Sequence, residues 1–136
     1  MLSRSDMVSV QFIKFGMVGV IGLAVDTAVL YALIYGASAG PYGARILSFL
    51  AAVTTTWALN RCFTFRGDHP DPVHHQWAKF IVANSLGGLI NYGVYAGLIA
   101  SGDPFAAHPV LAVCAGSLAG MFFNFAASKK LVFKGV

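Results

Sequence analysis

Charged residues are scarce in this sequence. Asp, Glu, Lys and Arg make up 10% of the 136 residues, whereas 57% are hydrophobic, and soluble domains normally carry about 25% charged residues. A chain of this size cannot hide so much apolar surface in one water-soluble core. Lipid must therefore be the solvent for most of it, and we expect a single domain, residues 1–136, with little room for a soluble catalytic part.

Motifs that carry chemistry are also missing. The two cysteines, Cys62 and Cys114, fit neither a disulfide framework nor a zinc site. The sequence contains no Walker loop, no dinucleotide fingerprint and no nucleophile with a neighbouring base. We therefore expect no catalytic residue, metal site, cofactor or enzymatic activity.

Two polar features of the sequence could suggest a nucleic-acid-binding surface or a metal site, but both have a simpler explanation. The net charge of +4 would suit nucleic acid, but the basic residues flank apolar runs, as they do in membrane proteins. The loop 66–76 carries acidic and histidine residues beside two prolines and without helical spacing, so we expect a solvated loop rather than a metal site. These residues are Asp68, His69, Asp71, His74 and His75.

Four apolar runs occupy residues 15–36, 44–59, 80–100 and 109–127. At 1.5 Å per residue three of the runs are about as long as the ~30 Å hydrocarbon core, and the second is the shortest. The sequence therefore predicts an all-α membrane protein with four transmembrane helices.

The basic residues predict its orientation. Of nine Lys and Arg residues, eight lie on the side of the termini and the central loop, and only Arg45, near the start of the second run, lies on the other side. Cytoplasmic loops carry the excess of such residues, so we expect a multi-pass protein of the cell inner membrane with both termini cytoplasmic. Lys134 is expected on a frayed terminus. The basic residues of the cytoplasmic side are Arg4, Lys14, Arg61, Arg66, Lys79, Lys129, Lys130 and Lys134.

The sequence repeats itself. The matched pairs are Gln11 with Gln76, Phe15 with Phe80, Gly22 with Gly87 and Asp26 with Asn91 at an offset of 65, and Asn60 with Ser128, Arg61 with Lys129, Phe65 with Phe133 and Gly67 with Gly135 at an offset of 68. Repeat one spans about 11–67 and repeat two about 76–135. Both start in the cytoplasm, so we expect two helical hairpins in parallel orientation, related by a pseudo-two-fold axis along the membrane normal, with a substrate in the cleft between them.

Each predicted helix has a seam of small or polar residues at spacings of three or four. Such seams let helices approach closely or hydrogen-bond to each other, and they also offer polar groups to a substrate. The seams are Gly19, Gly22 and Asp26; Ser48, Ala52, Thr56 and Asn60; Asn84, Gly87 and Asn91; and Gly116, Gly120, Asn124 and Ser128.

Asp26 is the one acidic residue inside an apolar run. It lies 11 residues after Phe15, about 16 Å along a helix, where an ionised carboxylate costs at least ~2.5–3.5 kcal/mol and usually has a function. A proton or a cationic group is the expected ligand. The structural alternative is a hydrogen bond between helices, to Asn91 or Asn84.

The basic residues at the cytoplasmic ends of the helices offer a second candidate site. Lys14, Arg61, Lys79, Lys129 and Lys130 are expected to converge there, and basic pockets between helices at this depth bind phosphate head groups. The topology rule alone explains the charge but not its repetition at matched positions. Arg61 and Lys129 are therefore the candidate phosphate ligands.

Three short patterns resemble the GtrA-like family of membrane proteins. They are Phe15-x3-Gly19-x6-Asp26, Leu59-Asn60-Arg61-x3-Phe65, and Asn124-Phe125-x2-Ser128-Lys129-x3-Phe133. The resemblance spans residues 11–134. The chain departs from the family at Lys129-Lys130-Leu131, where an aromatic often follows the basic residue.

The resemblance implies a function in cell-surface polysaccharide or O-antigen glycosylation. Family members move polyprenyl-phosphate-linked sugars across the inner membrane, or support the membrane glycosyltransferases that use them. Two alternatives stay open, a non-transporting scaffold for such a transferase and a proton-coupled exporter of small cations. Four helices enclose little space, so we expect a homo-oligomer among membrane lipids. The candidate substrate contacts are Asp26, Arg61, Lys129, Asn60, Asn84, Asn91, Asn124, Lys14 and Lys79.

Overall fold

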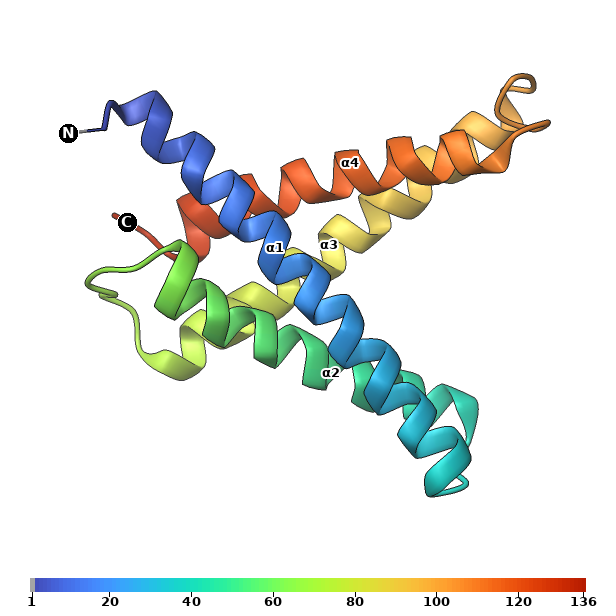
Figure 1. Cartoon of the computed structure of the whole chain (residues 1–136), viewed down its shortest axis with the longest axis horizontal. Coiled ribbons are helices and arrows are strands. Elements are labelled where there is room, and N and C mark those ends of the chain that lie inside the picture. The colour runs from blue at the N-terminus through green and yellow to red at the C-terminus, as the bar shows by residue number, and fades with distance from the viewer. Residues whose placement is uncertain (1) are drawn as a thin grey trace. The chain divides into compact units, whose positions relative to one another are not determined.

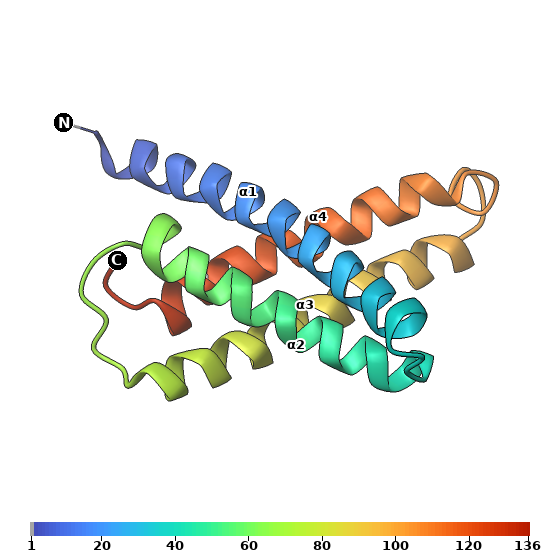
Figure 2. The same cartoon turned by 60° about the horizontal axis from the view of Figure 1, so that its bottom comes forward.

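The computed structural model describes residues 2–136, and this part of the chain contains helices and turns but no strand. The chain divides into two compact units, one ending at His69 and including Val136, the other comprising residues 70–135. Each unit is a hairpin of two long helices (Figure 1). In both views α1 runs beside α2, and α3 runs beside α4 (Figure 2).

In the first hairpin, α1 spans Arg4–Tyr31 and continues as the π-helical segment Ala32–Gly36. Ser3 and Asp6 form a capping box before the first turn, which satisfies free backbone N–H groups there. After residues 37–40, α2 spans Pro41–Leu59 and continues as the π-helical segment Asn60–Thr64.

In the second hairpin, α3 spans Val73–Ala100 and follows Pro72 directly. Residues 101–108 connect it to α4, which spans Pro109–Ala127 and continues as the π-helical segment Ser128–Val132. Proline begins α4, as it begins α2, because its fixed φ suits the first turn and its missing N–H would have no helical partner there.

The predicted helices are confirmed in number within residues 2–136, and the fourth has the predicted bounds. The other three are longer than their apolar runs. The capping box starts α1 at Arg4 rather than at residue 15, so residues 4–14 are also helical. Likewise α3 includes residues 73–79, because polar residues such as Gln and Lys have good helix propensity. The second helix, α2, begins at Pro41 rather than at residue 44.

Three of the helices described in residues 2–136 are long and apolar enough to cross a membrane. They are Arg4–Gly36, Pro41–Thr64 and Pro109–Val132. The third helix of the chain, α3, has sufficient length, but Asn84, Asn91 and four glycines reduce its hydropathy. Large apolar side chains such as Val20, Leu23 and Leu89 are more than 60% exposed, as lipid-facing residues are.

Small residues bring the two helices of each hairpin together. A Cβ atom on Gly22 of α1 would overlap Thr56 of α2, and one on Gly87 of α3 would overlap the side-chain amide of Asn124 of α4. In the second hairpin, a Cβ on Gly116 would lie 2.5 Å from the backbone oxygen of Asn91. The close contacts between helices therefore require glycine, which has no side chain, at these positions.

The open end of each hairpin is closed by a pair of aromatic rings. Phe15 packs edge-on against Phe65 with ring centroids 6.3 Å apart, and Phe80 packs in the same way against Phe133 at 5.9 Å. Phe65, Phe80 and Phe133 are at most 1% exposed. Each pair joins a residue in the first half of α1 or α3 to the residue that follows the π-helical segment of the other helix, so both hairpins end in the same way.

Candidate functional site

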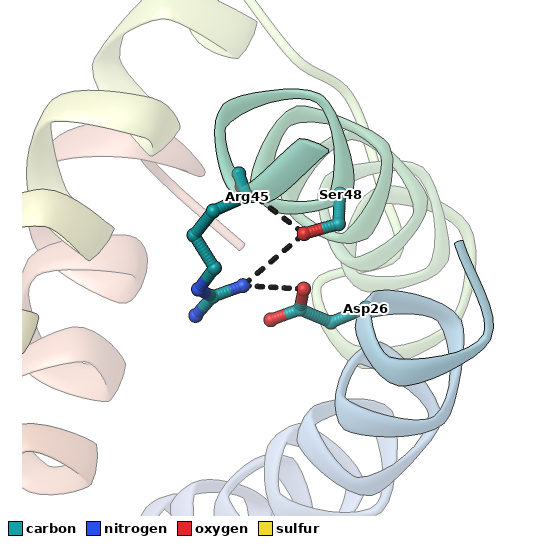
Figure 3. A network of polar contacts seen from close by, with 3 residues as sticks. All are labelled: Asp26, Arg45 and Ser48. Carbon is teal, nitrogen blue, oxygen red and sulfur yellow. Dashed lines mark hydrogen bonds and ion pairs between the residues drawn. The ribbon is translucent and has the colours of Figure 1, made fainter. Parts of the chain in front are cut away.

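Asp26 and Arg45 form an ion pair inside the first hairpin (Figure 3). Arg45 lies in the second turn of α2, and its Nη1 donates to Asp26 Oδ1 at 2.5 Å and to Ser48 Oγ at 3.2 Å. Ser48 Oγ in turn donates to the backbone oxygen of Arg45 at 3.0 Å. The Asp26 side chain is 19% exposed and the Arg45 side chain 56%.

This pair gives Asp26 a partner other than the expected asparagines. The sequence suggests Asn91 or Asn84 as a partner within the protein, and it distinguishes Arg45 only as the single basic residue outside the cytoplasmic side. Because α2 runs back along α1, the guanidinium reaches the carboxylate and balances its charge within the hairpin. One acidic residue in an apolar run and one basic residue just across the turn are the signal that identifies such a pair from sequence.

The four candidate asparagines contact groups in their own hairpins. The buried Asn60 accepts through Oδ1 from Thr64 Oγ1 at 2.8 Å, and Asn84 Nδ2 donates to the backbone oxygen of Phe80 at 2.9 Å. Asn91 faces Gly116, and the Asn124 amide lies against Gly87. Asn124 Oδ1 is buried and accepts no hydrogen bond from the residues that the structure describes. Asn91 and Asn124 therefore contribute to the packing of α3 against α4, whereas Asn60 and Asn84 bond within their own helical segments.

Among the candidate lysines, Lys14 and Lys79 occupy matched positions in the first half of α1 and of α3 but contact different groups. Lys14 Nζ lies 4.7 Å from the centroid of the Phe63 ring, a cation–π contact. Lys79 Nζ donates to Asp71 Oδ2 at 2.8 Å. Arg61 and Lys129 occupy the second positions of the π-helical segments Asn60–Thr64 and Ser128–Val132, and both are partly exposed.

Asp71 holds two lysines of the second hairpin. The Oδ2 atom that accepts from Lys79 also lies 3.4 Å from Lys134 Nζ. The hydrogen bond from Lys79 is the main reason that the pKa of Asp71 lies below its ordinary value of 3.8; partial desolvation opposes the shift and the charge of Lys134 adds to it. The expectation of a frayed Lys134 is therefore wrong, because opposite charges from the two ends of the hairpin's sequence meet there. Asp68, His74 and His75 of the same loop are exposed.

Next to these lysines the second hairpin has an apolar groove of about 500 Å³. Lys79 and Lys134 line it together with alanine, valine, leucine and phenylalanine side chains of α3, α4 and the segment Ser128–Val132. No motif in the sequence marks this groove. The sequence indicates it only through two basic residues, Lys79 near the start of the second hairpin's sequence and Lys134 near its end, with apolar residues beside each.

Two helical hairpins with apolar exteriors, close glycine contacts and basic residues at their open ends define a polytopic helical membrane protein. The match to known families agrees with this class. The chain belongs to the GtrA/DPMS transmembrane-domain family, whose family model matches residues 14–135, and the resemblance found in the sequence is thus confirmed. No curated protein matches the chain.

Proposed function

We propose that this protein moves a polyprenyl-phosphate-linked sugar across the inner membrane for cell-surface polysaccharide or O-antigen glycosylation. The observation that carries the proposal is the family match over residues 14–135, which takes in both hairpins. In this proposal all four helices span the membrane, both termini are cytoplasmic, and the two hairpins act together as one translocating unit without catalysing a reaction.

The distribution of charge supports the proposal. Each hairpin carries basic residues at its open end, where the first helix begins and the second ends, namely Lys14 and Arg61 in one and Lys79 and Lys129 in the other. Phosphate oxygens are strong acceptors for such donors. Asn84, Asn91 and Asn124 are half-buried and supply polar groups along the helices, suited to the hydroxyl groups of a sugar, whereas Asn60 is buried and bonds to Thr64.

The alternative of a cation exporter depends on Asp26 as a carboxylate that lacks a charged partner within the protein. A cation exporter needs a carboxylate that can accept a cation from solution, whereas Asp26 already holds the guanidinium of Arg45. The scaffold alternative needs only an exposed surface for a membrane glycosyltransferase. Such transferases and further copies of the chain are also the partners that we propose for a translocating protein.

Reconstitution tests the function directly. Purified protein in liposomes should move a short-chain, fluorescent polyprenyl-phosphate sugar between leaflets, measured as loss of access to a membrane-impermeant quencher. Empty liposomes are the control. Arg61→Lys should slow this movement at unchanged net charge, because lysine cannot donate two parallel hydrogen bonds to a phosphate as the guanidinium does.

Two results would contradict the proposal. Movement at the rate of empty liposomes, together with co-purification of a transferase from the membrane, would support the scaffold. Proton-driven uptake of a small cation without any lipid requirement would support the exporter.

A further inference from the structure

The apolar groove of the second hairpin opens at the protein surface. Val82 and Leu131 line it and are 59% and 63% exposed, while Ala83 and Val132 form its buried floor at 7% and 1%. Its volume of about 500 Å³ lies within the ~300–1,000 Å³ of typical ligand sites. A hydrocarbon chain fits such a lining, since the groove offers it apolar contacts along its length.

Two lysines and one carboxylate form a charged group at the groove. Lys79 and Lys134 both line it, and both lie within 3.4 Å of one carboxylate oxygen of Asp71. A lysine ammonium has three donors, so contact with Asp71 leaves donors on each for another acceptor. Two ammonium groups and one carboxylate carry a net charge of +1.

The first hairpin has no copy of this arrangement. Its residue matched to Lys79 is Lys14, which lies over the Phe63 ring, and the acidic residue matched to Asp71 is Asp6, which caps α1 through Ser3. The two hairpins share their packing and their aromatic ends. The carboxylate with two lysines is thus a property of the second hairpin and is not required to form a hairpin of this kind.

We propose that the groove holds the chain of the lipid-linked sugar, that Lys79 and Lys134 bind its phosphodiester, and that Asp71 disfavours the unglycosylated lipid phosphate. The proposal rests on the function proposed above for the identity of the lipid. A phosphodiester carries one negative charge, whereas a phosphate monoester carries about −1.5 to −2 at pH 7. A net charge of +1 matches the diester, and the Asp71 carboxylate repels the extra charge of the monoester.

Binding to the detergent-solubilised, full-length protein tests this selectivity. The probes are a short-chain polyprenyl-phosphate sugar and the matching polyprenyl phosphate. The wild type should prefer the sugar-carrying diester. Asp71→Asn should raise the affinity for the monoester about tenfold, the effect of removing one nearby, partly screened like charge, and should raise the affinity for the diester less.

Two further sets of variants locate the ligand. Lys79→Gln and Lys134→Gln should each weaken diester binding about tenfold, while Arg4→Gln, at an exposed position outside the groove, should not. Leu86→Trp should block the groove, whereas Leu89→Trp, one turn further along α3 and outside the lining, should not. Circular dichroism and size-exclusion chromatography establish that each variant keeps the helical fold.

The outcomes separate this inference from the proposed function. A wild type that binds neither probe contradicts both. Diester binding that Lys79→Gln, Lys134→Gln and Leu86→Trp leave unchanged contradicts only the groove. Weaker monoester binding in Asp71→Asn would show that Asp71 merely ties the loop to the hairpin, and equal displacement of the diester by anionic phospholipid would show that the groove holds bulk lipid.

Discussion

The ion pair between Asp26 and Arg45 changes what each residue would do alone. A carboxylate or a guanidinium without a partner is costly in lipid, and removing one member of a shielded pair leaves the other uncompensated. The first hairpin contains both members, so the charge of Asp26 no longer requires a ligand from outside the protein.

The coupling of this pair can be measured. Asp26→Asn and Arg45→Gln should each destabilise the protein, and the double variant should recover part of the loss, with a coupling energy of roughly 0.5–3 kcal/mol. Reversible unfolding in mixed micelles gives the free energies. Arg4→Gln is the control, since it removes a charge at the start of α1 outside any apolar run. Additive effects of the two single variants would show that the contact does not contribute to stability.

A second prediction at the residue scale concerns pH. Asp71 has a lower pKa in the folded protein than its ordinary value of 3.8, so its carboxylate stabilises the folded state above pH 3.8. This stabilisation is lost as the pH falls below 3.8 and through the pKa of the folded state. Wild type should therefore have a higher Tm than Asp71→Asn at pH 7, and the difference should vanish in acid.

The exposed Asp68 in the same loop gives the control. Asp68→Asn should leave Tm unchanged at pH 7, and high salt should reduce the effect of Asp71→Asn by screening. A Tm difference for Asp71→Asn that persists unchanged into strong acid would contradict an origin in the charge of Asp71.

At the scale of helices, the close contacts predict how much stability each Gly→Ala substitution should cost. A Cβ on Gly116 meets the backbone of Asn91, whereas one on Gly22 meets only the end of the Thr56 side chain, which can turn away. Gly116→Ala should therefore cost about 1–3 kcal/mol of stability and Gly22→Ala less. Gly88→Ala is the control in a helix of the same hairpin as Gly116, since a methyl group there would have no atom within 4 Å. Equal losses for all three variants would contradict contact as the cause.

The sequence predicts the helices well and their partners less well. Apolar runs and prolines locate α4 to the residue, because hydropathy and backbone geometry are local properties. Gly22 and Gly87 belong to the predicted small-residue seams, and both lie at close contacts. Gly19 belongs to the same pattern, but a Cβ on it would have no atom within 4 Å, because helical spacing defines a face but not which residue on it meets a neighbour.

Charged contacts are the least predictable part of the site. Arg45 reaches Asp26 only because the turn at 37–40 reverses the chain, and Asp71 meets Lys134 only because the end of the chain returns to the loop before α3. The first contact joins residues on the two sides of one turn, which the sequence can suggest, whereas the second joins residues near the two ends of the hairpin's sequence, which it does not. Arg61 and Lys129 stay predictions as phosphate ligands, since their role depends on a lipid.

At the scale of the whole molecule, membrane topology is the first prediction. In a background of Cys62→Ser and Cys114→Ser, Asp103→Cys should react with an impermeant maleimide added to intact cells, and Asp68→Cys should react only after permeabilisation. The reason is the excess of Lys and Arg in the loop that contains Asp68. Only α3 lies between these loops, so the pair also tests whether this helix crosses the membrane.

Each outcome has a separate meaning. Reaction of Asp68→Cys alone from outside would reverse the orientation. Reaction of both from the same side would show that α3 does not span, in line with its lower hydropathy.

The π-helical ends of the hairpins limit where the gene can gain or lose codons. In Asn60–Thr64 and Ser128–Val132 the closing hydrogen bonds run from Phe65 to Asn60 and from Phe133 to Ser128, both at 2.7 Å, so each loop holds one residue more than an α-helical turn. Deleting one codon there would turn the phenylalanine by about 100° around the helix and away from its aromatic partner. The connections 37–40 and 101–108 differ in length, and among the described residues no aromatic contact there depends on a fixed number of residues. Insertions and deletions should therefore accumulate in the connections 37–40 and 101–108 and be removed by selection in Asn60–Thr64 and Ser128–Val132.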